Sequence, residues 1–141
     1  MKRPEIGVGA VIFRADEVLM IRRGKAPRKG EWAIPGGRQE LGETVAEGAR
    51  REVLEETGVT CRIHGLIDVV DGINRDADGR LVYHYTLVDM WGEWLQGEAV
   101  AGSDAMAACF MPLSEVPRLG LWPETLRIIT MAERLRAAAS G

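Results

Sequence analysis

The chain has 141 residues, of which 46% are hydrophobic and 28% charged, and its formal net charge is −3 at pH 7. This composition is typical of a folded globular protein, and the length predicts a single domain spanning residues 1–141. The small negative charge gives no reason to expect a stable nucleic-acid partner. There is no signal-peptide core and no membrane-length apolar run, so we expect a cytoplasmic protein that does not bind membranes.

The two cysteines, Cys61 and Cys109, lack the spacing of a metal site and show no disulfide pattern. They are therefore predicted to be core thiols in a reducing compartment.

The chain begins with two predicted strands, residues 6–14 and 18–21, joined by a turn into a hairpin. The second is a continuous apolar run, which is typical of a strand covered on both faces. Residues 22–30 follow, with five basic residues and no acidic one. This segment is either a solvated loop or a binding segment for an anionic substrate. Arg22 and Arg23 are the candidate substrate-binding residues, because they lie nearest the end of the strand.

A helix is predicted from Thr44 to Thr57. Thr44 and Glu47 have the spacing of a capping box, and Gly58 fits the left-handed residue that ends a helix. Between these limits an apolar stripe predicts packing against a sheet.

Glu52, Glu55 and Glu56 lie at positions i, i+3 and i+4, so three carboxylates share one face of this helix. Each like-charge neighbour at that spacing costs about 0.2–0.5 kcal/mol, a repulsion that a divalent cation would relieve. Mg²⁺ fits, because it takes oxygen ligands and is usually shared with substrate phosphates. The alternative is a solvated helix face on which Arg51 bridges Glu47 and Glu55.

The residues around this helix also follow a fixed spacing. Gly37 is followed after five residues by Glu43, and after seven more by REVLEETGV, residues 51–59. This arrangement resembles the signature box of the Nudix hydrolase superfamily, G-x5-E-x7-R-E-U-x-E-E-x-G-U, with every specified position filled. The box covers residues 37–59, and the strand, basic hairpin and C-terminal helix that flank it are also similar to the family.

The resemblance implies an α/β Nudix fold, a three-layer α/β/α sandwich around a mixed β-sheet, with Mg²⁺ or Mn²⁺ as cofactor. It also implies that Glu52 or Glu55 helps to activate water. The implied metal ligands are the carboxylates of Glu52, Glu55 and Glu56, with a backbone carbonyl of Gly36 or Gly37.

Two further residues of the box are implied to be structural: Arg51 would orient the glutamates, and Glu43 would pin the loop before the helix. Nudix enzymes often supply one more acid, as ligand or base, from a loop ahead of a late strand. Asp104 is the first candidate for this catalytic acid, because it lies six residues ahead of Phe110, where the family often has an aromatic residue. Glu98 is the second.

The reaction implied by the resemblance is hydrolysis of a pyrophosphate bond in a nucleoside diphosphate linked to another group. Such a bond carries negative charge that repels an incoming hydroxide, and metal ions offset this repulsion while holding the reacting groups in line. Positioning and charge neutralisation supply most of the rate in phosphoryl transfer. The chemistry therefore needs no serine, cysteine or histidine nucleophile.

After the box, residues 60–70 and 81–90 are predicted strands, joined by a polar loop at 71–80. Three aspartates in that loop raise a rival metal site, but the remaining ligands of an EF-hand are missing. Trp91 and Trp94, at the expected end of the second strand, either stack on a nucleobase or cover a homodimer contact.

The chain ends with a predicted strand at 106–111, a connector at 112–120 and a helix that begins at Trp122-Pro123. This helix is expected to cover the face of the sheet opposite the first helix.

The identity of the substrate is the least constrained inference. Some ADP-ribose-cleaving relatives have a proline about sixteen residues past the box, and Asn74-Arg75-Asp76 here lacks one. Residues 71–85 are nevertheless similar to a group labelled ADP-ribose pyrophosphatase-like, so ADP-ribose is the first candidate substrate. A nucleoside triphosphate pyrophosphohydrolase is the second possibility.

A different class of protein, a nucleotide-binding sensor without turnover, also stays open. Such regulators usually carry an appended DNA-binding domain, for which 141 residues leave no room. The complete set of acidic residues in the box favours catalysis over this alternative.

Overall fold

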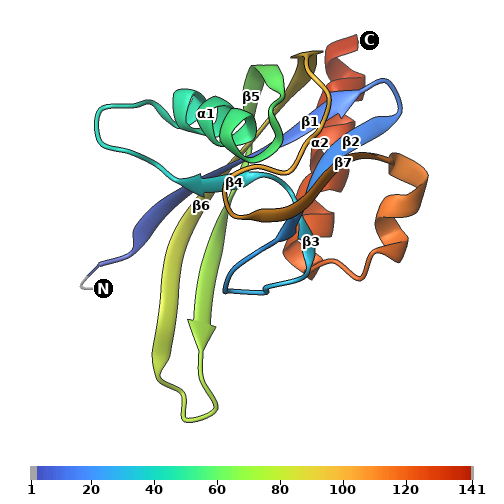
Figure 1. Cartoon of the computed structure of the whole chain (residues 1–141). Helices are drawn as coiled ribbons and strands as arrows, with labels where there is room; N and C mark the ends of the chain where they lie inside the picture. Colours follow the sequence, from blue (N-terminus) through green and yellow to red (C-terminus); the bar gives the residue numbers. More distant parts are fainter. Residues whose placement is uncertain (1–2, 141) are drawn as a thin grey trace.

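The computed structural model describes residues 3–140 (Figure 1). The strands are β1 (Glu5–Arg14), β2 (Glu17–Arg23), β3 (Trp32–Ala33), β4 (Gly36–Arg38), β5 (Thr60–Arg75), β6 (Leu81–Gln96) and β7 (Ala105–Pro112). The helices are α1 (Val45–Thr57), α2 (Pro123–Ser140) and a short 3₁₀ helix, η1 (Leu113–Arg118).

The strands form one mixed sheet in the order β3-β2-β1-β6-β5, with β4 paired to β1 and β7 paired to β2. β1 runs parallel to β6, and the other pairings are antiparallel. β5 and β6 form a long hairpin whose distal end projects from the body of the molecule (Figure 1). The sheet therefore places β1 at its centre, next to β4 and the start of α1.

The two long helices cover opposite faces of this sheet (Figure 1). On one face, α1 packs in a buried cluster of Val8, Ala10, Ile12, Leu19, Ala49, Val53, Val59, Cys61 and Met90. On the other, α2 packs in a cluster of Val11, Phe13, Val18, Met20, Ile67, Val70, Trp91, Val116, Ile128, Ile129 and Ala132. Successive side chains of a strand point to opposite faces, so β1 contributes to both clusters. The predicted three-layer α/β/α sandwich is confirmed.

Helix α1 has the ends that its sequence predicts. The Thr44 hydroxyl accepts a hydrogen bond from the Glu47 N–H at 3.1 Å, and the Glu47 carboxylate accepts one from the Thr44 N–H at 2.9 Å. At the other end Gly58 has a φ of 73°, and its N–H donates to the Leu54 carbonyl. The capping box and the glycine cap thus fix where the helix starts and stops.

The predicted bounds of the long hairpin were wrong. β5 continues to Arg75 and β6 to Gln96, so the loop is only residues 76–80. Pairing between the two strands offsets the turn-forming composition of residues 71–75, because strand stability depends on cross-strand contacts more than on local propensity. Trp91 and Trp94 lie inside β6 rather than at its end, and Trp91 is buried in the core.

None of the helices within residues 3–140 combines the length and the apolar composition needed to cross a membrane. Cys61 is buried and Cys109 is partly buried, and both are free thiols.

Replacing Gly58 by alanine should lower the free energy of unfolding by about 1 kcal/mol, because a side chain in the left-handed region costs roughly 1–2 kcal/mol. Space is not the obstacle, since the nearest atom to an added Cβ, the Glu98 carbonyl oxygen, would be 3.8 Å away. Gly58→Asn should cost less, because asparagine tolerates this conformation. Urea unfolding of the three proteins measures the difference. An alanine variant as stable as the parent would contradict the role assigned to Gly58.

Candidate functional site

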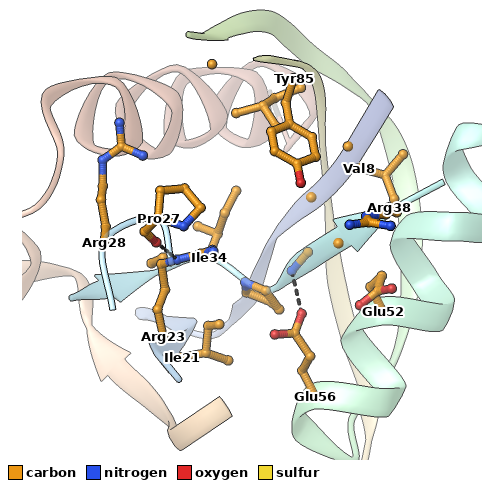
Figure 2. A pocket seen from close by; sticks show the side chains of 18 of the residues that line it. Val8, Ile21, Arg23, Pro27, Arg28, Ile34, Arg38, Glu52, Glu56 and Tyr85 are labelled. Carbon is orange, nitrogen blue, oxygen red and sulfur yellow. Dashed lines mark hydrogen bonds between the residues drawn. The ribbon is translucent and has the colours of Figure 1, made fainter. Parts of the chain in front are cut away.

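A cavity of about 930 Å³ lies beside the C-terminal half of α1. Its walls come from α1, the β4 glycines, the basic loop after β2, the sheet strands β1, β5 and β6, and the first turn of α2. Figure 2 shows Glu52 and Glu56 on one side of this space and Arg23 and Arg28 on another. The acidic box and the basic loop, separate in the sequence, thus share one cavity.

Glu56 is the buried carboxylate of the site. It is 7% exposed, and its Oε1 accepts a hydrogen bond from the Gly36 N–H at 2.7 Å (Figure 2). Burial raises the pKa of Glu56 to about 7, the hydrogen bond from Gly36 lowers it, and the nearby charge of Glu52 raises it. In the free protein this carboxylate therefore lacks a full compensating charge.

Glu52 lies directly over the backbone of Gly37. A Cβ on Gly37 would be 2.5 Å from the Glu52 Cδ and Oε2 atoms. Gly36 has a similar constraint from the other side, because an added Cβ would meet the Val8 carbonyl oxygen at 2.5 Å in the paired strand β1. Gly37 thus lets the Glu52 carboxylate approach the main chain closely, and Gly36 lets strands β1 and β4 pack closely, which side chains at these positions would prevent.

Arg51 binds four groups at once. Its Nε and Nη2 donate to both carboxylate oxygens of Glu43, at 3.0 and 2.7 Å. Nη1 donates to Glu52 Oε1 at 2.8 Å and to Glu55 Oε2 at 3.2 Å, and Nη2 also donates to the Arg38 carbonyl. The bidentate pair with Arg51 lowers the pKa of Glu43 to about 2. The guanidinium therefore ties the loop before α1 to the acidic face of the helix.

The carboxylate groups of Glu52, Glu55 and Glu56 do not converge on one point in this structure. Among residues 3–140, no three histidine, cysteine, aspartate or glutamate side chains are grouped so that they could hold a metal ion. Glu52 and Glu55 are hydrogen-bonded to Arg51, while Glu56 faces Gly36. The donor set still fits a hard divalent cation, because it consists of adjacent carboxylate oxygens, one of them buried without a counter-charge.

Of the two acids considered for the late loop, Asp104 lies at the cavity and Glu98 does not line it. The Asp104 carboxylate forms an ion pair with Lys25 Nζ at 2.7 Å, which joins the loop before β7 to the basic loop. Glu98 instead pairs with Arg14 at 3.4 Å. The structure therefore brings Asp104 near the box glutamates, where its charge contributes to the raised pKa of Glu56.

Arg22 and Arg23 differ in their position relative to the cavity, and the pairing of β2 with β7 shifts its register between them. Arg23 lines the cavity, and its Nε donates to the Pro27 carbonyl at 2.6 Å. Arg22 does not line the cavity, and its Nε donates to the Gly30 carbonyl at 2.8 Å. The structure thus brings only one of the two predicted arginines to the site.

Several lining residues were missed by the sequence analysis. Figure 2 shows the Tyr85 hydroxyl pointing into the cavity, and Asp89 follows on the same side of β6. The Arg28 guanidinium stacks on the Trp122 ring, 3.7 Å from its centroid, and joins the basic loop to the start of α2. The signal for Asp89 was an acidic residue inside an apolar strand. Neither Trp91 nor Trp94 lines the cavity, and a homodimer stays a prediction.

Comparison with known proteins identifies the fold and the box together. Residues 3–131 match the model of the NUDIX domain family. The chain belongs to this family. The resemblance drawn from residues 37–59 is thereby confirmed. Nudix hydrolases generally use divalent metal ions.

Three proteins illustrate which members of the Nudix family this chain is similar to. An ADP-ribose pyrophosphatase of Methanocaldococcus jannaschii is 37% identical over 82% of the chain, and the chain spans 66% of that relative, just under two thirds. A MutT NUDIX hydrolase structure from Burkholderia pseudomallei has a TM-score of 0.78 at 29% identity, covering 92% of this chain and 98% of that one. The NUDIX domain of Shewanella oneidensis NrtR, complexed with ADP ribose, has a TM-score of 0.77 at 26% identity, with coverages of 96% and 90%.

Glu56 should make the metal-free protein less stable as the pH rises. Its pKa is higher in the folded state, about 7 against an ordinary 4.5, so the folded state binds more protons and stability falls between these two values. Glu56→Gln removes this penalty while keeping an acceptor for Gly36. The variant should exceed the parent by roughly 1–3 kcal/mol at pH 8 and by much less at pH 5.

Denaturant unfolding with a chelator present, at both pH values, measures this difference. Glu133→Gln, at an exposed position on α2, is the control and should show no such trend. A pH-independent difference for Glu56→Gln would show that the carboxyl is not held at a raised pKa.

Proposed function

We propose that this Nudix chain hydrolyses the pyrophosphate bond of a nucleoside diphosphate linked to another group, with ADP-ribose as the first substrate. The observation that carries the proposal is the meeting of Glu52, Glu55 and Glu56 with the basic Arg23 across one cavity. Its volume of about 930 Å³ is near the upper end of the usual range for ligand pockets, which suits a large nucleotide. The names of the Methanocaldococcus relative and of the NrtR complex support ADP-ribose.

The proposed cofactor is Mg²⁺ or Mn²⁺. The carboxylates of Glu52, Glu55 and Glu56 would hold it, together with a backbone carbonyl of Gly36 or Gly37. When bound, the cation supplies positive charge that polarises the phosphoryl oxygens and makes water a better nucleophile.

The side chains around the glutamates have separate tasks in this proposal. Arg51 orients Glu52 and Glu55 through direct hydrogen bonds, and Glu43 holds Arg51 in place. The proton of the attacking water is accepted by Glu52, Glu55 or Asp104. Among the two helix carboxylates Glu55 is the more accessible, with 47% of its side chain exposed against 14% for Glu52.

The basic loop is proposed to hold the phosphates. Arg23 uses only its Nε for the Pro27 carbonyl, and no hydrogen bond from its Nη atoms is found within residues 3–140. These two terminal nitrogens are free to bind a phosphate oxygen in the bidentate geometry that a guanidinium favours. Arg28 lines the same side of the cavity and adds positive charge.

Glu55→Gln and Glu56→Gln should each lower turnover by roughly 10²–10⁴-fold, the contribution expected of a positioned acid, base or ligand at the reaction centre. A panel of ADP-ribose, other nucleoside diphosphate conjugates and nucleoside triphosphates, each with Mg²⁺ and with Mn²⁺, measures turnover from the phosphate-containing products. Faster triphosphate cleavage would favour a triphosphate pyrophosphohydrolase. Nucleotide binding without turnover would favour a sensor. Full activity in both variants would contradict the site.

Arg23→Gln should raise the KM about 10- to 100-fold with little change in kcat, because a charged hydrogen bond to substrate is lost. Arg22→Gln is a matched control: the adjacent arginine also anchors the basic loop through one Nε–carbonyl bond, but does not line the cavity. Steady-state kinetics of both variants separates phosphate binding from loop anchoring. Equal effects would assign Arg23 to the loop alone.

A further inference from the structure

A second buried carboxyl, Asp89, lies in the same cavity and has no task in the reaction described above. It is 8% exposed and lies in β6. Tyr85, Leu87 and Asp89 occupy every second position of this strand, so they share one face, and all three line the cavity. Leu87 packs against the cluster under α2, so Asp89 is on the α2 side of the sheet. The cavity therefore has buried carboxyl groups at two places: Glu56 on the α1 side of the sheet and Asp89 on the α2 side.

Two glycines of β1 make room for this face of β6. Gly7 and Gly9 pair with Leu87 and Asp89 in the parallel register. A Cβ on Gly9 would be 2.7 Å from Asp89 Oδ1, and a Cβ on Gly7 would be 2.7 Å from Leu87 Cδ2. Both side chains thus extend across the neighbouring strand, and glycine is what permits it.

Asp89 has no partner in the part of the chain that the structure describes. No hydrogen bond or ion pair to its carboxylate is found within residues 3–140. Arg127, whose charge acts on Asp89, is bound instead to Asp68 Oδ2 at 2.9 Å and to Glu124. Burial raises the pKa of Asp89 to about 7, Arg127 lowers it, and Asp68 raises it. Within residues 3–140, the only sealed side-chain polar atom without a partner is Glu5 Oε2, so the Asp89 oxygens remain open to the cavity, where a ligand can bind them.

The position of Asp89 limits what that partner can be. Gly9 lies between the two ends of the site: it pairs with Gly36, whose N–H binds Glu56, and it contacts Asp89 on its other side. A pyrophosphate against the box glutamates would be repelled by a further carboxylate. An uncharged part of the same substrate that offers hydrogen-bond donors would meet no such repulsion.

We propose that Asp89 is a specificity-determining residue, whose carboxyl group accepts a hydrogen bond from a neutral O–H or N–H donor on the substrate beyond its pyrophosphate. This inference rests on the proposed function. A ribose hydroxyl and the N–H edge of a nucleobase share this chemistry. The position beside Gly9, across β1 from the Gly36–Glu56 contact, makes Asp89 a recognition group rather than a participant in bond cleavage.

The test compares the parent protein with Asp89→Asn and Asp89→Ser, and uses Asp68→Asn as a matched control. Asp68 pairs with Asp89 across β5 and β6, but its carboxylate binds Arg127 and it does not line the cavity. Asp89→Ser, whose side chain is too short to reach the donor, should raise the KM for the best substrate about 10- to 100-fold with kcat little changed, and Asp89→Asn, which keeps an acceptor oxygen, should raise it less. Asp68→Asn should leave both constants near those of the parent.

Calorimetric titration with a chelator present identifies the donor independently of turnover. The probes are AMP, 2′-deoxy-AMP, IMP and ribose 5-phosphate. If the 2′-hydroxyl is the donor, its removal weakens binding to the parent but not to Asp89→Ser. If the 6-amino group is the donor, the same holds for the change from AMP to IMP. An effect of Asp89→Ser on ribose 5-phosphate alone places the donor on the ribose that is not part of the adenosine.

Thermal unfolding separates recognition from a structural role. Because Asp89→Asn removes an unpaired buried carboxyl, its melting temperature at pH 8 should equal or exceed that of the parent. Unchanged KM and probe affinities in both Asp89 variants would overturn the proposal. So would a loss of affinity that accompanies a lower melting temperature in both. A parent protein that hydrolyses no substrate in the panel would defeat the proposed function instead, and the probe titrations would still decide the role of Asp89.

Discussion

The concentration of negative charge in the last turns of α1 is the constraint on which the rest of the site depends. Three glutamates share one face, and Glu55 and Glu56 lie near the C-terminus of the helix, where the helix dipole also disfavours anions. The last turn contains no basic residue. Arg51, one turn earlier, offsets part of this repulsion by binding Glu52 and Glu55. A helix with no task at this place would not need such an arrangement.

Arg51 offsets the charge of only some of these glutamates, and the one that it does not bind is Glu56, the buried one. Arg51 reaches Glu43, Glu52 and Glu55, whereas Glu56 receives only the N–H of Gly36. Proteins are usually consistent across local rules and depart from them at functional sites, where stability is given up. The raised pKa of Glu56 reflects that departure, because the folded protein holds this carboxyl buried without an ion-pair partner at the expense of its own stability.

Local patterns were sufficient to predict α1, and non-local pairing explains what they missed. The capping box and Gly58 fix both ends of the helix within the sequence itself, and the box residues lie on that helix or in the loop before it. The extent of β5 and β6 depends on their mutual pairing, which the turn-rich composition of residues 71–75 conceals. The difference between Arg22 and Arg23 depends on how the end of β2 lies relative to the cavity. Asp89 reaches the site only because β6 runs beside β1.

Glu56 and Asp89 show how the same physical effect can serve two purposes in one cavity. Burial raises both pKa values to about 7, so neither carboxyl is stable as an isolated anion. Their surroundings differ: Glu56 lies among like charges that a divalent cation can neutralise together, whereas Asp89 is separated from them by the glycine strand β1. In the proposals made above, a cation would satisfy the first site and neutral hydrogen-bond donors would satisfy the second. A phosphate anhydride joined to a sugar or a base, bound together with a cation, would offer both kinds of contact. In this proposal the substrate and its cation complete a cavity that holds two buried acids without an ion-pair partner.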